Sequence, residues 1–121
     1  MIRVIVSGAA GRMGREVVRA VTEAEDMEIV AAIDMHEVGK DAGELAGVGP
    51  LDIPVSDSLP TSLTRERQPP EVLGDFTIPS SVRRNVEIAL KARVSPVVGT
   101  TGLSPADLKE IDLLAQGIGA F

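Results

Sequence analysis

The chain has 121 residues, of which 44% are apolar and 25% are charged, and its formal net charge is -6. This length suits one globular core, so we expect a single domain over residues 1–121. The acidic balance argues against nucleic acid or an anionic membrane surface as the main partner. With no cysteine and one histidine, the chain offers no disulfide, thiolate metal site or His cluster, and we expect no bound metal.

The N-terminal segment lacks the basic-then-apolar layout of a signal peptide, and no apolar run reaches the roughly 18–20 residues that span a bilayer. We therefore expect a cytoplasmic domain. Phe76 and Phe121 are the only aromatic residues, so aliphatic side chains must fill the core. A core rich in Ala, Val, Ile and Leu suits helices packed on a buried parallel sheet.

The first part of the chain alternates strand and helix patterns. The β-branched run at residues 2–6 predicts a strand that is buried on both faces. Residues 12–24 carry apolar side chains at helical spacing and predict a helix. Residues 28–33 predict a second buried strand, which ends at Asp34.

The segment from residue 36 to residue 60 is rich in Gly, Asp and Pro and predicts little regular structure. A short strand at 53–55 and a helix with Asp57 as its N-cap fit the pattern, although Pro60 counts against that helix.

The second half of the chain repeats the alternation. It predicts strands at residues 71–76 and 96–99, separated by a helix that Pro79 opens and that runs to Arg93. The apolar stripe of this helix consists of Val82, Val86, Ala89 and Leu90.

Ser104 is expected to cap a further helix over residues 105–116, and residues 117–121 begin another strand. Strand and helix thus alternate, which predicts an α/β fold with a parallel sheet covered by helices on both faces. Ligands of such sheets bind beyond the carboxyl ends of the strands, where the strand order reverses. The binding segments expected from this rule are residues 7–14, 34–36, 76–79 and 99–102.

The loop GAAGRMG at residues 8–14 joins the first strand to the first helix. Gly8 would permit an unusual backbone angle, Gly11 a close approach of the backbone to a ligand, and Gly14 tight packing of helix on sheet. Amides at the helix start and the helix dipole would favour a pyrophosphate. The pattern departs from G-x-G-x-x-G because Ala10 takes the middle position, and a turn without a ligand remains the alternative.

Asp34 ends the second strand 20 residues after Gly14, at the spacing where a carboxylate accepts hydrogen bonds from the adenosine ribose. The alternative for this residue alone is a strand-end turn. Together with the glycine loop, Asp34 favours dinucleotide binding.

The carboxylate of Asp34 would repel a 2′-phosphate, which favours NADH over NADPH. Met35 and His36 follow it and supply no adjacent cation for a phosphate, although Lys40 and Arg12 can still reach.

Two further segments, DFTIP at 75–79 and GTTGLS at 99–104, each follow a predicted strand. They place hydroxyl groups at the same edge of the sheet as the glycine loop. The alternative is that Thr77, Thr100 and Thr101 merely cap helix starts.

The segments GAAGRMGREV, DFTIPSSV and VVGTTGLSP resemble, in this order and spacing, the 4-hydroxy-tetrahydrodipicolinate reductase family of lysine and diaminopimelate biosynthesis, also called dihydrodipicolinate reductase. The resemblance implies a Rossmann-type domain of an NAD(P)H-dependent oxidoreductase. It implies hydride transfer to a cyclic, unsaturated amino dicarboxylate, with tetrahydrodipicolinate as the product. Thr101 would also face this substrate. The cofactor contacts it implies are Gly8, Ala9, Ala10, Gly11, Arg12, Met13, Asp34, Phe76, Thr77, Gly99, Thr100 and Thr101.

The chain departs from the family pattern in three places. Phe121 is its last residue, before the A-P-N motif that the family carries next, and no H-H-x-x-K segment is present. That segment supplies the general acid in a second domain, so we expect no catalytic residue here, and His36 lies in the wrong loop to replace it. Gly74 occupies a strand position where a branched residue is expected, which should weaken that strand. The resemblance implies a homotetramer formed through the second domain, and for this chain alone a monomer or pairing through the sheet edge after Phe121 stays open.

We therefore expect the isolated chain to bind NAD(H) weakly without reductase activity. Two rival interpretations remain. One is the cofactor domain of another oxidoreductase, such as an aspartate or homoserine dehydrogenase, and the other is a stand-alone NADH-sensing module. A reading frame that continues past Phe121 into the missing motifs would favour the reductase.

Overall fold

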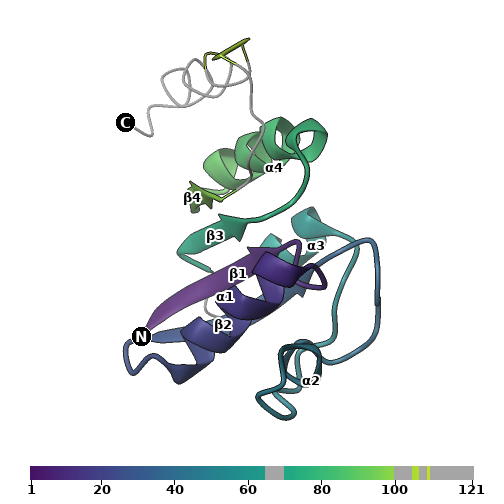
Figure 1. Ribbon diagram of the computed structural model, residues 1–121. Helices are drawn as coiled ribbons and strands as arrows, with labels where there is room; N and C mark the ends of the chain where they lie inside the picture. The colour runs from purple at the N-terminus through teal and green to yellow at the C-terminus, as the bar shows by residue number, and fades with distance from the viewer. Residues whose placement is uncertain (65–69, 100–104, 107–108, 110–121) are drawn as a thin grey trace.

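The computed structural model describes residues 1–64, 70–99, 105–106 and 109. Its sheet has four parallel strands in the order β2-β1-β3-β4 (Figure 1). Strand β2 lies on one side of β1, and β3 and β4 lie on the other side, so the strand order reverses between β1 and β3. The strands are β1 (Ile2–Ser7), β2 (Met27–Ile33), β3 (Val72–Asp75) and β4 (Ser95–Val98).

Helices cover both faces of this sheet, as the alternating pattern predicted (Figure 1). On one face, α1 (Arg12–Glu23) and α2 (Ala42–Ala46) pack with Val4 and Val6 of β1. On the other, α3 (Leu59–Thr64) and α4 (Pro79–Lys91) pack with Ile5 of β1. The stripe predicted for α4, Val82, Val86, Ala89 and Leu90, is buried throughout.

A bulge interrupts the pairing of β1 with β2. Val4 pairs with Ile29, but Ile5 pairs with Ala31, so Val30 is an extra residue in β2. As a result, Ile29 and Ala32, three positions apart, both face the α1 side of the core.

The segment between β2 and β3 differs most from expectation. The strand predicted at 53–55 does not form; two isolated bridges, Ile33 with Ser56 and Asp41 with Pro54, take its place. The predicted helix is present as α3, but it begins at Leu59, so Ser58 and not Asp57 precedes its first turn, and the Ser58 hydroxyl accepts from the N–H of Thr61 (3.4 Å). Pro60 is tolerated because it lies in the first turn, where its missing N–H costs nothing.

The short helix α2 has no counterpart in the sequence-based prediction, and Asp41 explains why it forms. The Asp41 carboxylate accepts hydrogen bonds from the backbone N–H groups of Glu44 (3.1 Å), Leu51 (3.0 Å) and Ile53 (2.8 Å). One side chain thus caps α2 and folds the following loop back onto it. Burial acts to raise the pKa of Asp41, but these backbone donors outweigh it, and the pKa lies below its usual value.

Residues 105, 106 and 109 are helical, in agreement with the helix predicted over 105–116. The cap at Ser104, the remainder of that helix and the strand predicted at 117–121 lie outside the described residues.

Candidate functional site

The glycine loop follows β1 at the point where the strand order reverses. Gly8 has φ +85°, and a Cβ there would lie 2.7 Å from the carbonyl oxygen of Phe76, so both conformation and space require glycine. A Cβ on Gly14 would lie 1.9 Å from the carbonyl oxygen of Gly8. Helix α1 therefore packs directly on the backbone of the glycine loop at Gly14, whereas the sequence predicted packing of the helix on the sheet there.

The start of α1 is open to an anion. Gly11 is the N-cap, with no side-chain cap, and the first turn contains no acidic residue. Among the described residues, no protein acceptor pairs with the amides of Arg12 and Met13. A Cβ on Gly11 would meet only the Gly8 carbonyl, at 3.4 Å, so little protein crowds this point. These features fit the pyrophosphate of a dinucleotide.

Asp34 ties the end of β2 to the glycine loop. One carboxylate oxygen accepts from the backbone N–H of Ala10 (2.9 Å), and the other accepts from the N–H of His36 (2.8 Å). The bond to His36 is the strand-end turn that stood as the alternative, whereas the bond to Ala10 goes beyond it. The side chain remains 13% exposed, and each carboxylate oxygen can accept a second hydrogen bond.

A second carboxylate, Asp75, anchors the end of β3 and is fully buried. One of its oxygens accepts from both the backbone N–H (3.0 Å) and the hydroxyl (2.6 Å) of Thr77, and the other accepts from the amide of Asn85 in α4 (3.1 Å). Thr77 therefore does not cap α4, whose N-cap is Ile78. Sequence reasoning missed Asp75, although an acid ending a buried strand was a signal of an anchored turn.

Phe76 lies between two glycines. A Cβ on Gly74 would approach its ring to 3.0 Å, and a Cβ on Gly99 would approach it to 2.3 Å. Gly74 in the strand, which was expected to be only a weakness, thus makes room for this aromatic ring.

The predicted site residues therefore gather around one edge of the sheet. Gly8 touches Phe76, Ala10 bonds to Asp34, and Gly99 lies against the Phe76 ring. The backbone of Ala9 is bonded to Ile33, which holds the loop against β2. Arg12 and Met13 stay exposed at the helix start, with Met13 57% exposed. Thr100 and Thr101 lie outside the described residues.

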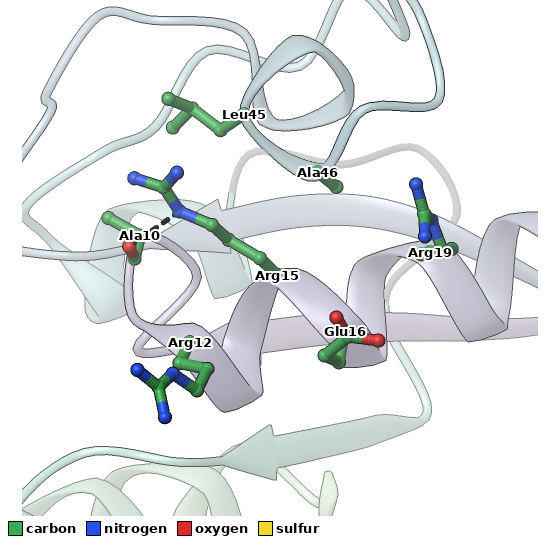
Figure 2. Close-up of a pocket in the computed structure, with 7 residues that line it drawn as sticks. All are labelled: Ala10, Arg12, Arg15, Glu16, Arg19, Leu45 and Ala46. Carbon is green, nitrogen blue, oxygen red and sulfur yellow. Dashed lines mark hydrogen bonds between the residues drawn. The ribbon is translucent and has the colours of Figure 1, made fainter.

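A pocket of about 410 Å³ lies beside the loop, between α1 and α2 (Figure 2). Arg15 reaches across it, and its Nε donates to the carbonyl oxygen of Ala10 (2.8 Å). Sequence reasoning did not single out Arg15. Lys40, one of the two cations that the sequence left within reach of a phosphate, pairs with Glu37 at 2.5 Å.

Within the described part of the chain, no group of three or more His, Asp or Glu side chains is placed to hold a metal ion. In the same residues, no helix has the length and apolar character that a membrane span requires.

Fold and site together define a Rossmann-type domain with a dinucleotide-type phosphate loop at its switch point. The family model described as "Dihydrodipicolinate reductase, N-terminus" matches residues 2–121, and the chain belongs to this family. It spans less than half of the length of the curated relatives that it matches.

Two relatives and one solved structure illustrate the match. The chain is 48% identical to the 4-hydroxy-tetrahydrodipicolinate reductase of Desulfitobacterium hafniense, over 99% of this chain and 45% of that protein. It is 52% identical to that of a Nostoc species, over 95% of this chain and 44% of that protein. A dipicolinate-bound dihydrodipicolinate reductase from a Paenisporosarcina species has a TM-score of 0.75 at 33% identity, covering 98% of this chain and 44% of the other.

Proposed function

We propose that this chain is the NAD(P)H-binding domain of a 4-hydroxy-tetrahydrodipicolinate reductase. The observation that carries the proposal is the uncapped start of α1 at the switch point, with Asp34 bound to the same loop. The amides of Arg12 and Met13 have no protein acceptor among the described residues and face solvent, so an anion can reach them beside the carboxylate of Asp34.

The residues divide along the expected dinucleotide. Residues 8–13 would hold the pyrophosphate through backbone N–H groups, and Asp34 would accept from the adenosine ribose hydroxyls. The far side of the site would receive the nicotinamide half. The residues proposed there are Phe76, Thr77, Gly99, Thr100 and Thr101, with Thr101 also facing the substrate.

The reduced nicotinamide, when bound, would supply a hydride to 4-hydroxy-tetrahydrodipicolinate, which also takes up a proton from solution or from the second domain and loses water to give tetrahydrodipicolinate. This chain's residues bind and orient the coenzyme, and no catalytic side chain is assigned to them. We place the whole enzyme in the cytoplasm, as a homotetramer, in the lysine and diaminopimelate pathway.

Asp34 bears on the choice of coenzyme. Its carboxylate satisfies ribose hydroxyls and opposes a 2′-phosphate, so we propose that NADH binds more tightly than NADPH. Titration of the full-length protein with each coenzyme tests this preference. A tenfold advantage for NADPH would contradict it.

The reductase activity itself is tested with the full-length protein, authentic substrate and each reduced coenzyme, by following the loss of nicotinamide absorbance. We expect turnover that depends on substrate, and none from the isolated 121-residue chain. Coenzyme binding without turnover by the full-length protein would favour the sensing module, and turnover by the isolated chain would overturn the division of labour proposed here.

A further inference from the structure

Helix α4 holds the turn that follows β3. The side-chain amide of Asn85 in α4 lies 3.1 Å from one carboxylate oxygen of Asp75, the last residue of β3. A carboxylate only accepts hydrogen bonds, so the amide nitrogen of Asn85 is the donor. This bond spans 10 residues of sequence and fixes the end of the strand to the helix that packs on it.

The other oxygen of Asp75 determines how the hydroxyl of Thr77 is used. It accepts from the backbone N–H of Thr77 at 3.0 Å and from the hydroxyl of the same residue at 2.6 Å. So short a distance to oxygen is typical of a hydroxyl that donates to an ionised carboxylate. The hydroxyl proton thus points at Asp75, and toward a ligand the Thr77 oxygen acts as an acceptor, through its lone pairs.

Asn85 is needed to keep the carboxylate in this orientation. The terminal torsion of an aspartate has a broad energy well, so bonds at one oxygen leave the carboxylate plane free to turn. The bond from Asn85 to the second oxygen fixes that plane. Asp75 is fully buried, whereas Thr77 is partly exposed. The buried pair therefore sets the direction of a hydroxyl that a ligand can reach.

Thr77 lies between the glycine loop and the end of β4. A Cβ on Gly8 would lie 3.2 Å from the backbone nitrogen of Thr77, and the N–H of Gly99 donates to the Asp75 carbonyl oxygen at 2.9 Å. Strand β3 lies on the opposite side of β1 from β2, whose end carries Asp34. A dinucleotide that crosses the switch point with its adenosine at Asp34 places its nicotinamide nucleotide on the Thr77 side.

We infer that Asn85 is a positioning residue for the coenzyme: through Asp75 it holds the Thr77 hydroxyl as an acceptor for a hydrogen-bond donor of the nicotinamide nucleotide. The inference rests on the proposed dinucleotide function, since it places the adenosine at Asp34. Two groups of the nicotinamide nucleotide supply such a donor, the N–H of the carboxamide and the hydroxyls of the ribose. Asn85 itself touches no part of the coenzyme.

The test measures the affinity of the full-length protein for NADH and for ADP, which lacks the nicotinamide nucleotide. Thr77→Val should weaken NADH by roughly five- to tenfold, Asn85→Ala by about threefold, and neither should change ADP by more than about twofold. Thr77→Ser keeps the hydroxyl and should restore NADH affinity. Because Asn85 acts through Thr77, adding Asn85→Ala to Thr77→Val should cause no further loss. Arg84→Ala, at an exposed position beside Asn85 on α4, is the control and should alter neither affinity.

A coenzyme analogue identifies the donor. Reduced 3-acetylpyridine adenine dinucleotide carries an acetyl group in place of the carboxamide and therefore has no N–H there. If Thr77→Val weakens NADH but not this analogue, the donor is the carboxamide; equal weakening of both, with ADP unchanged, assigns the ribose hydroxyls. Weakening that extends to ADP, no weakening at all, or independent losses that add in the double variant would overturn the inference. If the unaltered protein binds neither NADH nor ADP, the proposed dinucleotide function fails instead.

Discussion

Strands β2 and β3 lie on either side of β1, and an aspartate stands at the carboxyl end of each. The two aspartates have different roles. Asp34 is partly exposed and reaches across to the glycine loop, so it retains capacity for a ligand. Asp75 is fully buried, and its carboxylate accepts hydrogen bonds from Thr77 and Asn85. The comparison teaches that position at the edge of a parallel sheet does not make a carboxylate a ligand group. Its exposure and its remaining hydrogen-bond capacity decide that.

The loop between the two carboxylates should give the largest effect. In Gly14→Ala the new Cβ would lie 1.9 Å from the Gly8 carbonyl oxygen, and both partners are backbone, so neither can yield cheaply. We expect a loss of about 3 kcal/mol in the free energy of unfolding, measured by denaturant titration. Gly11→Ala, whose Cβ meets only the same oxygen at 3.4 Å, is the matched control and should cost about 1 kcal/mol or less. Equal losses would show that close helix packing at Gly14 is not what the loop requires.

Removing the buried carboxylate should come next. Asp75→Ala leaves the donors of Thr77 and Asn85 without their acceptor, and we expect a loss of about 2–3 kcal/mol in the free energy of unfolding. Asp75→Asn keeps one acceptor oxygen and should lose less. If the alanine and asparagine variants were equally stable, hydrogen bonding by Asp75 would not be what holds this turn.

Asp41 extends the comparison to a carboxylate outside the site. Asp41→Ala removes an acceptor shared by three backbone N–H groups and should cost about 2 kcal/mol, with no effect on coenzyme affinity.

The pKa of Asp41 is lowered in the folded state. Its stabilisation is therefore fully present above its unfolded pKa and is lost as pH falls through the folded value. Stability measured across acidic pH should accordingly fall less steeply for Asp41→Asn than for the unaltered chain. An identical slope would contradict this assignment.

The smallest stability effect is expected at the partly exposed carboxylate of Asp34. Asp34→Asn keeps an acceptor for Ala10 and should cost less than about 1 kcal/mol in unfolding free energy. NADH affinity should nevertheless fall about tenfold, because the ribose hydroxyls lose a charged acceptor. The preference for NADH over NADPH should become smaller, because the negative charge of Asp34 no longer repels the 2′-phosphate of NADPH. A variant that binds both coenzymes unchanged would place Asp34 with Asp75, as a residue that holds its turn and contacts no ligand.

Much of the fold could be predicted from the sequence, because the local sequence patterns favour the same elements that tertiary packing requires. The β-branched run of β1, the apolar stripe of α4 and the glycines at 8 and 14 each specify what forms around them. The confirmed α/β class followed from their alternation.

The structure of residues 36–60 could not be predicted from local patterns, because hydrogen bonds between Asp41 and residues distant in sequence hold it together. Asp41 binds backbone groups 10 and 12 residues away, and no periodic pattern records such bonds. Arg15 was missed for a similar reason. Within the helix pattern it is an ordinary polar residue, and its place opposite Asp34 depends on how the loop folds.

The bulge at Val30 determines which side chains of β2 face which side of the sheet. In an uninterrupted strand, side chains at even and odd positions keep to opposite sides, and one extra residue exchanges the two sets from that point onward. Asp34 follows the bulge and is two residues after Ala32, so it lies on the same side of the sheet as Ala32, the side that α1 covers. If Val30 were instead paired as a regular strand residue, without the bulge, the carboxylate of Asp34 would face the α3–α4 side, away from Ala10. The bulge in β2 thus determines on which side of the sheet Asp34 lies.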